Sequence, residues 1–302
     1  MCREARDEAC VGYVEEVRAD RASARVIKIS AEETCPKATS DSSAETGKCK
    51  NTKCDVTIGG NPYCSQCSKL DEHLVDGKCV AAGGDANSNC VSNNQGSCTS
   101  CANSYFMYQS GCYQTGDQNP GNTLCTAASD GKCTTAAEGH FVPPGATASK
   151  QSVVKCDDTT GVEVSTNTYK GVLNCEVCRP SATPAGARTD SVAVCTKCGN
   201  SKYLKADGSG CVESSGCASG TEFAKEDTNN GNRCVPCGDK TDDIADCQTC
   251  SKPENALKCL TCSESNKPSV AGTGCFACPN SGATANCANC NEANVCALCT
   301  NG

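Results

Sequence analysis

Cysteine is the residue that most constrains how this chain folds. It occupies 33 of the 302 positions, which exceeds the roughly 8 to 10% that is typical of short disulfide scaffolds. Val, Ile, Leu and Phe together supply only 37 residues, or 12%, and chains below roughly 20% in these residues rarely bury a core of their own. The sequence therefore predicts many small cross-linked units in place of one large hydrophobic core.

The charge and the cysteine content indicate where such a protein resides. There are 35 acidic and 27 basic residues, with no Lys/Arg cluster that would neutralise a row of phosphates, so nucleic acid is excluded as a partner. Oxidised cysteine pairs are the expected state outside the cell. The first residues are charged where a signal peptide needs an apolar run, and no run of ~20 apolar residues follows. We therefore expect a fragment or an ectodomain of an exported protein.

Ten Cys-x-x-Cys pairs recur along the chain, and four of them head a longer repeat. The repeat consists of Cys-x-x-Cys, ten to twelve further residues, and a third Cys that Gly precedes by one or two positions. We predict that these cysteines form structural disulfides. They are Cys64, Cys67 and Cys79; Cys98, Cys101 and Cys112; Cys195, Cys198 and Cys211; and Cys259, Cys262 and Cys275.

Each repeat is too short to fold alone. A strand carrying Leu74, Tyr105 or Tyr203, a turn at Gly77, Gly111, Gly208 or Gly210, and a returning Cys fit a β-hairpin. A bridge closing a loop of about 15 residues stabilises by ~3 kcal/mol, while ordering costs about 1.5 kcal/mol per residue, so each unit needs two bridges and its neighbours. We predict a small disulfide-rich fold: an elongated tandem array of short β-hairpins, as EGF-like or furin-like cysteine-rich units, with little helix and no single large core.

Composition divides the chain into five parts. The first part is atypical, with five charged residues among the first eight and a segment that fits a short helix followed by a strand over 25–30. A later alternation of Val162 and Val164 with Tyr169 and Val172 predicts a hairpin that turns near Asn167. The parts are an N-terminal segment (1–54), cysteine-rich repeats (55–138), a linker (139–152), hairpin and Cys-x-x-Cys units (153–214), and further repeats that end in mid-unit (215–302).

One span also matches a zinc ribbon. Cys175, Cys178, Cys195 and Cys198 place two Cys-x-x-Cys pairs with sixteen residues between them, a spacing at which four thiolates can surround zinc. Cys211 is the third cysteine of the repeat that begins at Cys195. A zinc site formed by the other four cysteines gives Cys211 no role, whereas a disulfide repeat gives it a bonding partner. We therefore predict disulfides, no metal and no cofactor, with zinc as the alternative, and expect Cys195 or Cys198 to bond outside the four.

The sequence offers no catalytic constellation. A redox-active Cys-x-x-Cys stands at a helix start in a βαβ context, which ten copies in turn-rich sequence do not provide. Nucleophilic catalysis needs a base, and the two histidines, His73 and His140, stand in polar, loop-like sequence where solvent exposure is expected. We therefore predict that the protein is not an enzyme.

Three features of the sequence, in addition to the repeat spacing, indicate a protein family. They are the density of Cys-x-x-Cys pairs, the segment SGCYQTGDQNPGNTLC over 110–125, and the hairpin YLKADGSGCV over 203–212. Together they resemble the variant-specific surface proteins of Giardia, a family of cysteine-rich ectodomains with a Gly-Gly-Cys-Tyr element, one membrane span and a short tail. The tetrapeptide here reads Ser-Gly-Cys-Tyr, so Gly111, Cys112 and Tyr113 match the motif. The resemblance covers most of the chain from Cys35 onward.

The resemblance implies a variant surface antigen at the extracellular face of the plasma membrane. Such a protein forms a protease-resistant coat on a parasite cell and takes part in antigenic variation and immune evasion. Its partners would be host antibodies and extracellular host factors, and its membrane anchor a C-terminal segment absent from this sequence. Two alternatives stay open: a receptor-like binding module, with Tyr105, Phe106 and Tyr108 as a candidate aromatic patch, and an intracellular zinc-binding adaptor.

Overall fold

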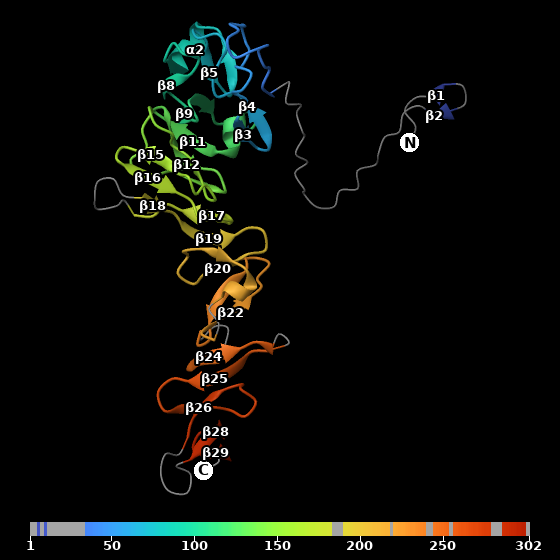
Figure 1. The fold of residues 1–302 in the computed structure, drawn as a ribbon, viewed down its shortest axis with the longest axis vertical. Helices are drawn as coiled ribbons and strands as arrows, with labels where there is room; N and C mark the ends of the chain where they lie inside the picture. The colour runs from blue at the N-terminus through green and yellow to red at the C-terminus, as the bar shows by residue number, and fades with distance from the viewer. Residues whose placement is uncertain are drawn as a thin grey trace.

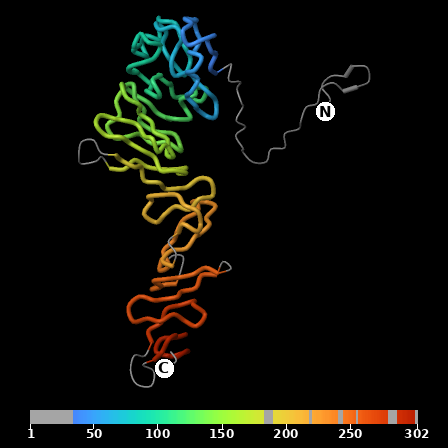
Figure 2. The backbone as a smooth tube through the Cα atoms, viewed as in Figure 1, coloured from blue at the N-terminus to red at the C-terminus, as the bar shows by residue number. Residues whose placement is uncertain are grey.

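The computed structural model is an elongated stack of small β-sheets (Figure 1). It describes residues 34–182, 190–217, 220–239, 244–253, 256–278 and 286–299, together with the backbone of two short strands near the N-terminus. The backbone tube descends the long axis from residue 34 to the C-terminal strands, with a broader upper half and a narrower lower half (Figure 2). The predicted helix and strand before residue 31 lie outside the described residues.

Nearly all regular structure is short β-strand, and the one α-helix described has six residues. The elements are β1 (Ala5–Arg6), β2 (Ala9–Cys10), β3 (Val56–Ile58), β4 (Asn61–Tyr63), β5 (His73–Val75), β6 (Lys78–Val80), α2 (Gly84–Asn89), β7 (Cys90–Ser92), β8 (Cys98–Cys101), β9 (Tyr105–Tyr108), β10 (Gly111–Gln114), η1 (Pro120–Thr123), β11 (Cys125–Ser129), β12 (Lys132–Ala136), β13 (His140–Phe141), β14 (Val154–Lys155), β15 (Val162–Val164), β16 (Asn167–Lys170), β17 (Cys175–Arg179), β18 (Asp190–Val192), β19 (Val194–Cys198), β20 (Tyr203–Leu204), β21 (Cys211–Val212), η2 (Ser214–Gly216), β22 (Glu222–Lys225), β23 (Arg233–Pro236), β24 (Cys247–Ser251), β25 (Lys258–Cys262), β26 (Asn266–Pro268), β27 (Cys275–Ala277), β28 (Cys287–Glu292) and β29 (Val295–Cys299).

Most sheets are single antiparallel hairpins, and two are pairs of hairpins. The strand orders β6-β5-β10-β9 and β21-β20-β23-β22 each join two hairpins through one parallel contact. In the first sheet Cys112 faces Val75, and in the second Leu204 faces Arg233. The fold class predicted from the sequence, a tandem array of short hairpins with little helix, is confirmed.

Tight two-residue turns set the register of several hairpins. A type I′ turn needs positive φ at both central residues, which favours Asp-Gly and Gly-Gly. Asp76-Gly77 has φ of 49° and 70°, Asp130-Gly131 has 52° and 78°, and Gly59-Gly60 has 58° and 80°. The turn before β10 is formed by Gln109 and Ser110, so the prediction of a turn at Gly111 was wrong, because Gly111 is the first residue of β10.

We expect Gly131→Ala to destabilise the protein much more than Gly60→Ala. Both glycines hold the second position of a turn at nearly the same φ, so both substitutions incur roughly 1 to 2 kcal/mol of left-handed strain. A Cβ at Gly60 meets nothing within 4 Å, whereas at Gly131 it lies 2.1 Å from the Cys101 carbonyl oxygen. Overpacking adds about 1 to 3 kcal/mol. Equal shifts of the thermal midpoint in the two variants would contradict this.

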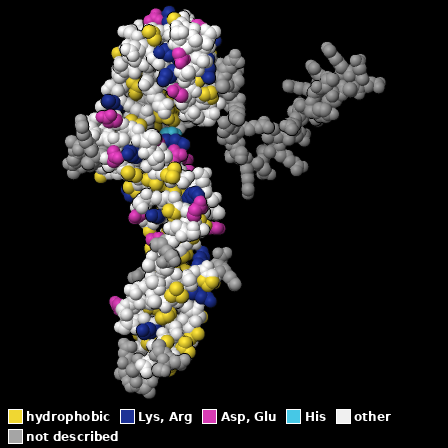
Figure 3. Space-filling model, viewed as in Figure 1, with side chains coloured by type: hydrophobic (Ala, Val, Ile, Leu, Met, Phe, Trp, Pro, Cys, Tyr) yellow, Lys and Arg dark blue, Asp and Glu magenta, His cyan; other side chains and the backbone are white. Residues whose placement is uncertain are grey.

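The buried side chains form separate clusters along the rod. The richest contains Val56, Phe106, Tyr113 and Leu124, with the Phe106 and Tyr113 ring centroids 6.3 Å apart. At the other end, the buried residues of the last cluster are Cys278, Cys287 and Cys290. Lys/Arg and Asp/Glu side chains are intermixed along the visible face (Figure 3). No single large core is present among the described residues, and cysteine supplies most of the buried side chains in several clusters at both ends of the rod.

Several residues that the sequence predicted to be exposed are buried or half-buried in the structure. Phe106 is 0% and Tyr108 is 8% exposed, so the candidate aromatic patch is wrong, because β9 turns these rings toward Tyr113. His73 lies in β5 at 6% exposure and His140 is half-buried in β13, so both are strand residues; burial lowers the pKa of His140. Within the predicted linker 139–152, Phe141 is 2% exposed and β13 pairs with β14.

Asp76 connects the first hairpin of the four-stranded sheet to β10, and its charge predicts a pH effect. Its backbone N–H donates to the Cys112 carbonyl at 2.9 Å, and its Oδ1 accepts from the Gln114 N–H at 2.8 Å. Burial raises the pKa of Asp76. The folded state therefore binds a proton more tightly than the unfolded chain, whose Asp pKa is about 3.9. Protonation of Asp76 therefore stabilises the folded state. This stabilisation is complete below pH about 3.9 and is lost as the pH rises through the pKa of Asp76 in the folded state.

We expect Asp76→Asn to raise the thermal midpoint at pH 7, because Asn keeps the acceptor oxygen, removes the buried charge and favours an Asn-Gly turn. Asp227→Asn is the control of opposite sign. Amides of Asn229 and Asn230 lower the pKa of Asp227 to about 2, so its stabilisation is present at neutral pH and is lost on acidification. Its replacement should lower the midpoint at pH 7. Thermal scans between pH 3 and 7 test both, and a lower midpoint for Asp76→Asn at pH 7 would contradict the assignment.

Candidate functional site

The candidate functional feature of this chain is its ladder of disulfides. Fifteen bridges are formed by the described cysteines, with sequence separations from 8 to 22 residues. Those of the upper half are Cys35–Cys54, Cys49–Cys64, Cys67–Cys79, Cys90–Cys98, Cys101–Cys112 and Cys125–Cys133. The others are Cys156–Cys178, Cys175–Cys195, Cys198–Cys211, Cys217–Cys234, Cys237–Cys250, Cys247–Cys259, Cys262–Cys275, Cys278–Cys290 and Cys287–Cys296.

In the nine Cys-x-x-Cys pairs whose cysteines are both bonded, the two cysteines bond in opposite directions along the chain. In the four predicted repeats the second cysteine bonds forward to the third cysteine of its own hairpin, as Cys198 does to Cys211. The first bonds backward to the preceding unit, as Cys195 does to Cys175. Each pair therefore connects a hairpin to its predecessor. Cys299 is exposed and is the one described cysteine without a disulfide partner.

A β-bulge makes this pattern possible. Residues three apart on a regular strand point to opposite faces, yet Cys175 and Cys178 contribute to one cluster. The pairing of β17 with β19 shifts register on both sides of Val177, and the extra residue of a bulge returns the second cysteine to the face of the first. β24 and β25 pair in the same way, with shifts around Thr249. Sequence spacing predicted the pairs, but it contained no signal for the bulges.

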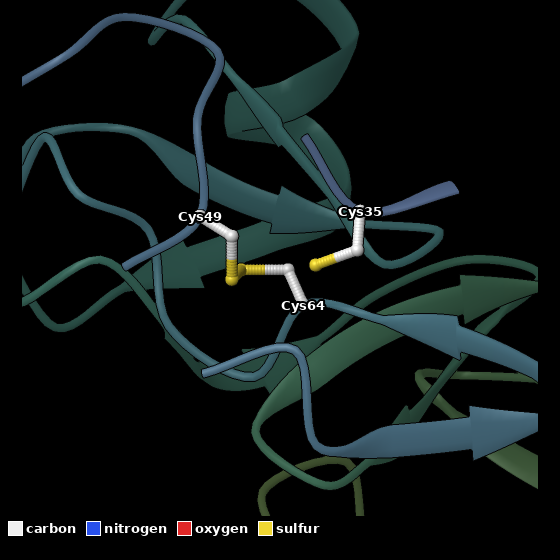
Figure 4. Close-up of side chains that lie close together, drawn as sticks. All are labelled: Cys35, Cys49 and Cys64. Atoms are coloured by element: carbon white, nitrogen blue, oxygen red, sulfur yellow. A yellow bond between two sulfur atoms is a disulfide. The ribbon is translucent and has the colours of Figure 1, made fainter. Parts of the chain in front are cut away.

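Neighbouring disulfides lie in direct contact. Cys259 Sγ is 3.5 Å from Cys275 Sγ, and Cys195 Sγ is 3.7 Å from Cys211 Sγ, although neither pair is bonded. Cys35, Cys49 and Cys64 have sulfurs within 4.8 Å of one another. Figure 4 shows the sulfur of Cys35 directed at the disulfide between the other two. The bridges therefore form the cores of the small units as well as their crosslinks.

The alternative zinc set is divided among three of these bridges. Cys175 bonds Cys195, Cys178 bonds Cys156, and Cys198 bonds Cys211. Zinc is held by thiolates, and a sulfur in a disulfide is not one. In this oxidised state the four residues therefore do not form a zinc-binding set, and two of them bond outside the four.

The three motif residues stand in the core of the upper half. Gly111 opens β10, where an added Cβ would lie 3.2 Å from Leu74. Cys112 is 0% exposed and bonds Cys101. Tyr113 is 0% exposed, burial raises its pKa, and its hydroxyl has no hydrogen-bond partner among the described residues. The motif therefore has a packing role in this chain.

A cavity of about 720 Å³ lies where β22 meets β24. Tyr203, Phe223 and Lys252 line it, together with residues of η2, β22 and β24. Lys252 Nζ is 5.2 Å from the Phe223 ring centroid and donates to the Ala224 carbonyl at 3.1 Å. Lys252 thus already interacts with residues that line the cavity. The lining therefore indicates no particular class of ligand.

Comparison with known proteins agrees with this architecture. A family model described as Giardia variant-specific surface protein matches residues 2–218. The chain belongs to this family. The major surface-labeled trophozoite antigen 417 of Giardia intestinalis is 40% identical over 245 residues, which are 77% of this chain and 34% of that protein. The Giardia intestinalis variant-specific surface protein VSP4A1 is 32% identical over 172 residues, covering 55% of this chain and 24% of its own.

The chain thus spans about a third or less of the length of these two relatives. No solved structure matches it. Among the described residues, no helix has the length and apolar character needed to cross a membrane. These comparisons establish that the chain belongs to the family and that it is similar to surface antigens of Giardia intestinalis.

Proposed function

We propose that this chain is the ectodomain of a variant surface antigen that forms a protease-resistant coat on a parasite cell. The observation that carries the proposal is the interlocked ladder, in which each bonded Cys-x-x-Cys pair joins one hairpin to the preceding one. Surface-antigen relatives support a location at the cell surface, and we propose that this chain lies at the extracellular face of the plasma membrane.

Resistance to proteases follows from the spacing of the bridges. A protease needs a locally unfolded segment in its active site, and segments with few restraints open first. Between Cys237 and Cys275 the bridges Cys237–Cys250 and Cys247–Cys259 overlap, and Cys262–Cys275 follows them, so almost every residue of this segment lies within a loop that a disulfide closes. Where a bond is cut, the two halves stay linked through sulfur. A coat built in this way keeps its shape in a protease-rich environment.

The outer surface suits antigenic variation. Exposed side chains in the loops, such as Asp117, Gln118 and Ser209, do not contribute to the buried clusters. Loops of this kind tolerate substitution because their side chains are solvated. We propose that host antibodies and extracellular host factors meet these loops, and that changes there evade recognition without loss of the fold.

The role is structural and not enzymatic. His73 is 6% exposed, and no nucleophile or carboxylate hydrogen-bonds its ring among the described residues. His140 Nδ1 lies 3.3 Å from the Glu138 carbonyl oxygen, and no nucleophile of the described residues hydrogen-bonds to it. Neither side chain is placed as a general base beside a nucleophile.

The test is digestion by trypsin of the native and the reduced, alkylated protein. The chain has 27 Lys and Arg residues, which give trypsin many potential sites. We expect the native protein to persist at least tenfold longer than the reduced one, and its cut fragments to migrate together on non-reducing gels. Equal rates of digestion would reject the protease-resistant coat.

A further inference from the structure

The sulfur of Cys259 lies against a disulfide to which it does not belong. Cys259 bonds Cys247, yet its Sγ is 3.5 Å from Cys275 Sγ and 3.9 Å from Cys262 Sγ. Cys262 and Cys275 bond each other. At these distances the sulfurs are in van der Waals contact, with no atom between the two bridges.

The same contact occurs in two other repeats. Cys195 Sγ is 3.7 Å from Cys211 Sγ, and Cys64 Sγ is 3.8 Å from Cys79 Sγ. In all three repeats the first two cysteines are buried, while the third, which closes the hairpin, is half-buried. The forward bridge is therefore the one that a reagent from solvent reaches, and the backward bridge lies directly behind it.

We propose that these three repeats are sites of internal thiol–disulfide exchange, in which a soluble dithiol opens the forward bridge and the thiol then moves inward to the backward bridge. Exchange proceeds by attack of a thiolate on a disulfide sulfur, and it requires access of one to the other. The S···S contacts supply that access without a change of fold.

The chemistry balances as follows for the repeat at Cys259. A thiolate of the dithiol attacks Cys275 Sγ, the Cys262–Cys275 bond breaks, and Cys262 leaves as a thiolate. The second dithiol thiolate closes the reagent into a cyclic disulfide and releases Cys275 as a thiolate. Cys262 then attacks Cys259 Sγ, the Cys247–Cys259 bond breaks, and Cys247 leaves as a thiolate. Reduction of the Cys262–Cys275 bridge passes two electrons from the dithiol to the chain. The attack of Cys262 on Cys259 transfers no further electrons from the dithiol.

The exchange changes what the bridges connect. A Cys259–Cys262 bond lies within β25, whereas the Cys247–Cys259 bond that it replaces joins β24 to β25. A reducing environment would thus convert a crosslink between strands into a local loop. The pairing of β24 with β25 becomes dependent on thiol conditions, while the number of disulfides falls by only one.

The first test is the full chain with Cys275→Ser, produced under oxidising conditions and labelled with a thiol-alkylating reagent at pH 8.5. The proposal expects label at Cys247 as well as Cys262, located by fragment mass spectrometry. Quenching at pH 5.5 before labelling should slow the appearance of label at Cys247, by about tenfold per pH unit below a thiol pKa near 8.5. Label confined to Cys262 at both pH values would overturn the proposal.

Cys133→Ser is the matched control. Its partner Cys125 lies in a cluster whose other members, Cys133 apart, are aliphatic and aromatic residues, so its thiol has no bridge to attack. Label should stay on Cys125 alone. Label at a distant cysteine in this variant would show general scrambling and would remove the support of the first test.

Partial reduction of the unmodified chain tests the proposal without a substitution. With limiting dithiol, thiols should appear at Cys247 in step with the loss of the Cys262–Cys275 bridge. The Cys101–Cys112 bridge should remain oxidised, because Cys112 is 0% exposed and the reagent does not reach it. Thiols at Cys262 and Cys275 with an intact Cys247–Cys259 bridge would overturn the proposal.

Discussion

Replacing Cys175 and Cys195 together with alanine should open the hairpin of β17 and β19 while the upper half of the rod stays folded. The bridge spans 20 residues, and its loss costs about 3 kcal/mol on the chain-entropy model. The surrounding cluster consists of cysteines and Val172, so few aliphatic contacts remain to hold the strands. We expect the amide protons of both strands to exchange with solvent at least a hundredfold faster, as about 3 kcal/mol of lost protection implies.

Removing Cys125 and Cys133 in the same way provides the comparison. That bridge spans 8 residues and lies in a cluster with Phe106, Tyr113 and Leu124. Aromatic packing of this kind is worth several kcal/mol on its own, so the β11–β12 hairpin should keep most of its amide protection. If the two double variants lose protection equally, the idea that cysteine substitutes for an aliphatic and aromatic core around Cys175 and Cys195 is wrong.

Complete reduction and alkylation of the chain should abolish its cooperative thermal transition. Each bridge contributes roughly 2 to 4 kcal/mol, whereas whole domains of ordinary composition are stable by only about 5 to 15 kcal/mol. With 12% of residues as Val, Ile, Leu or Phe, the reduced chain has no comparable source of stability. We expect loss of the dispersed amide proton spectrum throughout, with unmodified oxidised protein as the control. Retention of the native spectrum after reduction would contradict the account.

The sequence was sufficient for the architecture because cysteine spacing and turn residues act locally. The Cys-x-x-Cys pairs predicted stapled hairpins, and Asp76-Gly77 and Asp130-Gly131 mark tight turns by a known backbone requirement. The density of Cys-x-x-Cys pairs together with the segments over 110–125 and 203–212 predicted the family, which the comparison with known proteins confirmed.

Other features depend on contacts between units and carried no local signal. The exposed aromatic patch was wrong because Phe106 and Tyr108, which meet Tyr113 within the β9–β10 hairpin, also pack with buried residues of other elements, such as Val56 and Leu124. The histidines were expected in loops, but His73 pairs with Val80 in the β5–β6 hairpin, and β5 also pairs in parallel with β10, far along the chain. The bulges that place Cys175 and Cys178 on one face likewise follow from strand pairing.

The most direct test of the central claim is to map the disulfides of the native protein by mass spectrometry under non-reducing, acidic conditions. The account predicts that Cys156 is bonded to Cys178, Cys175 to Cys195, and Cys198 to Cys211. These links join three successive units and divide each Cys-x-x-Cys pair between two bridges. Bonds within the pairs, Cys175 to Cys178 and Cys195 to Cys198, or four free thiols at these positions, would contradict it.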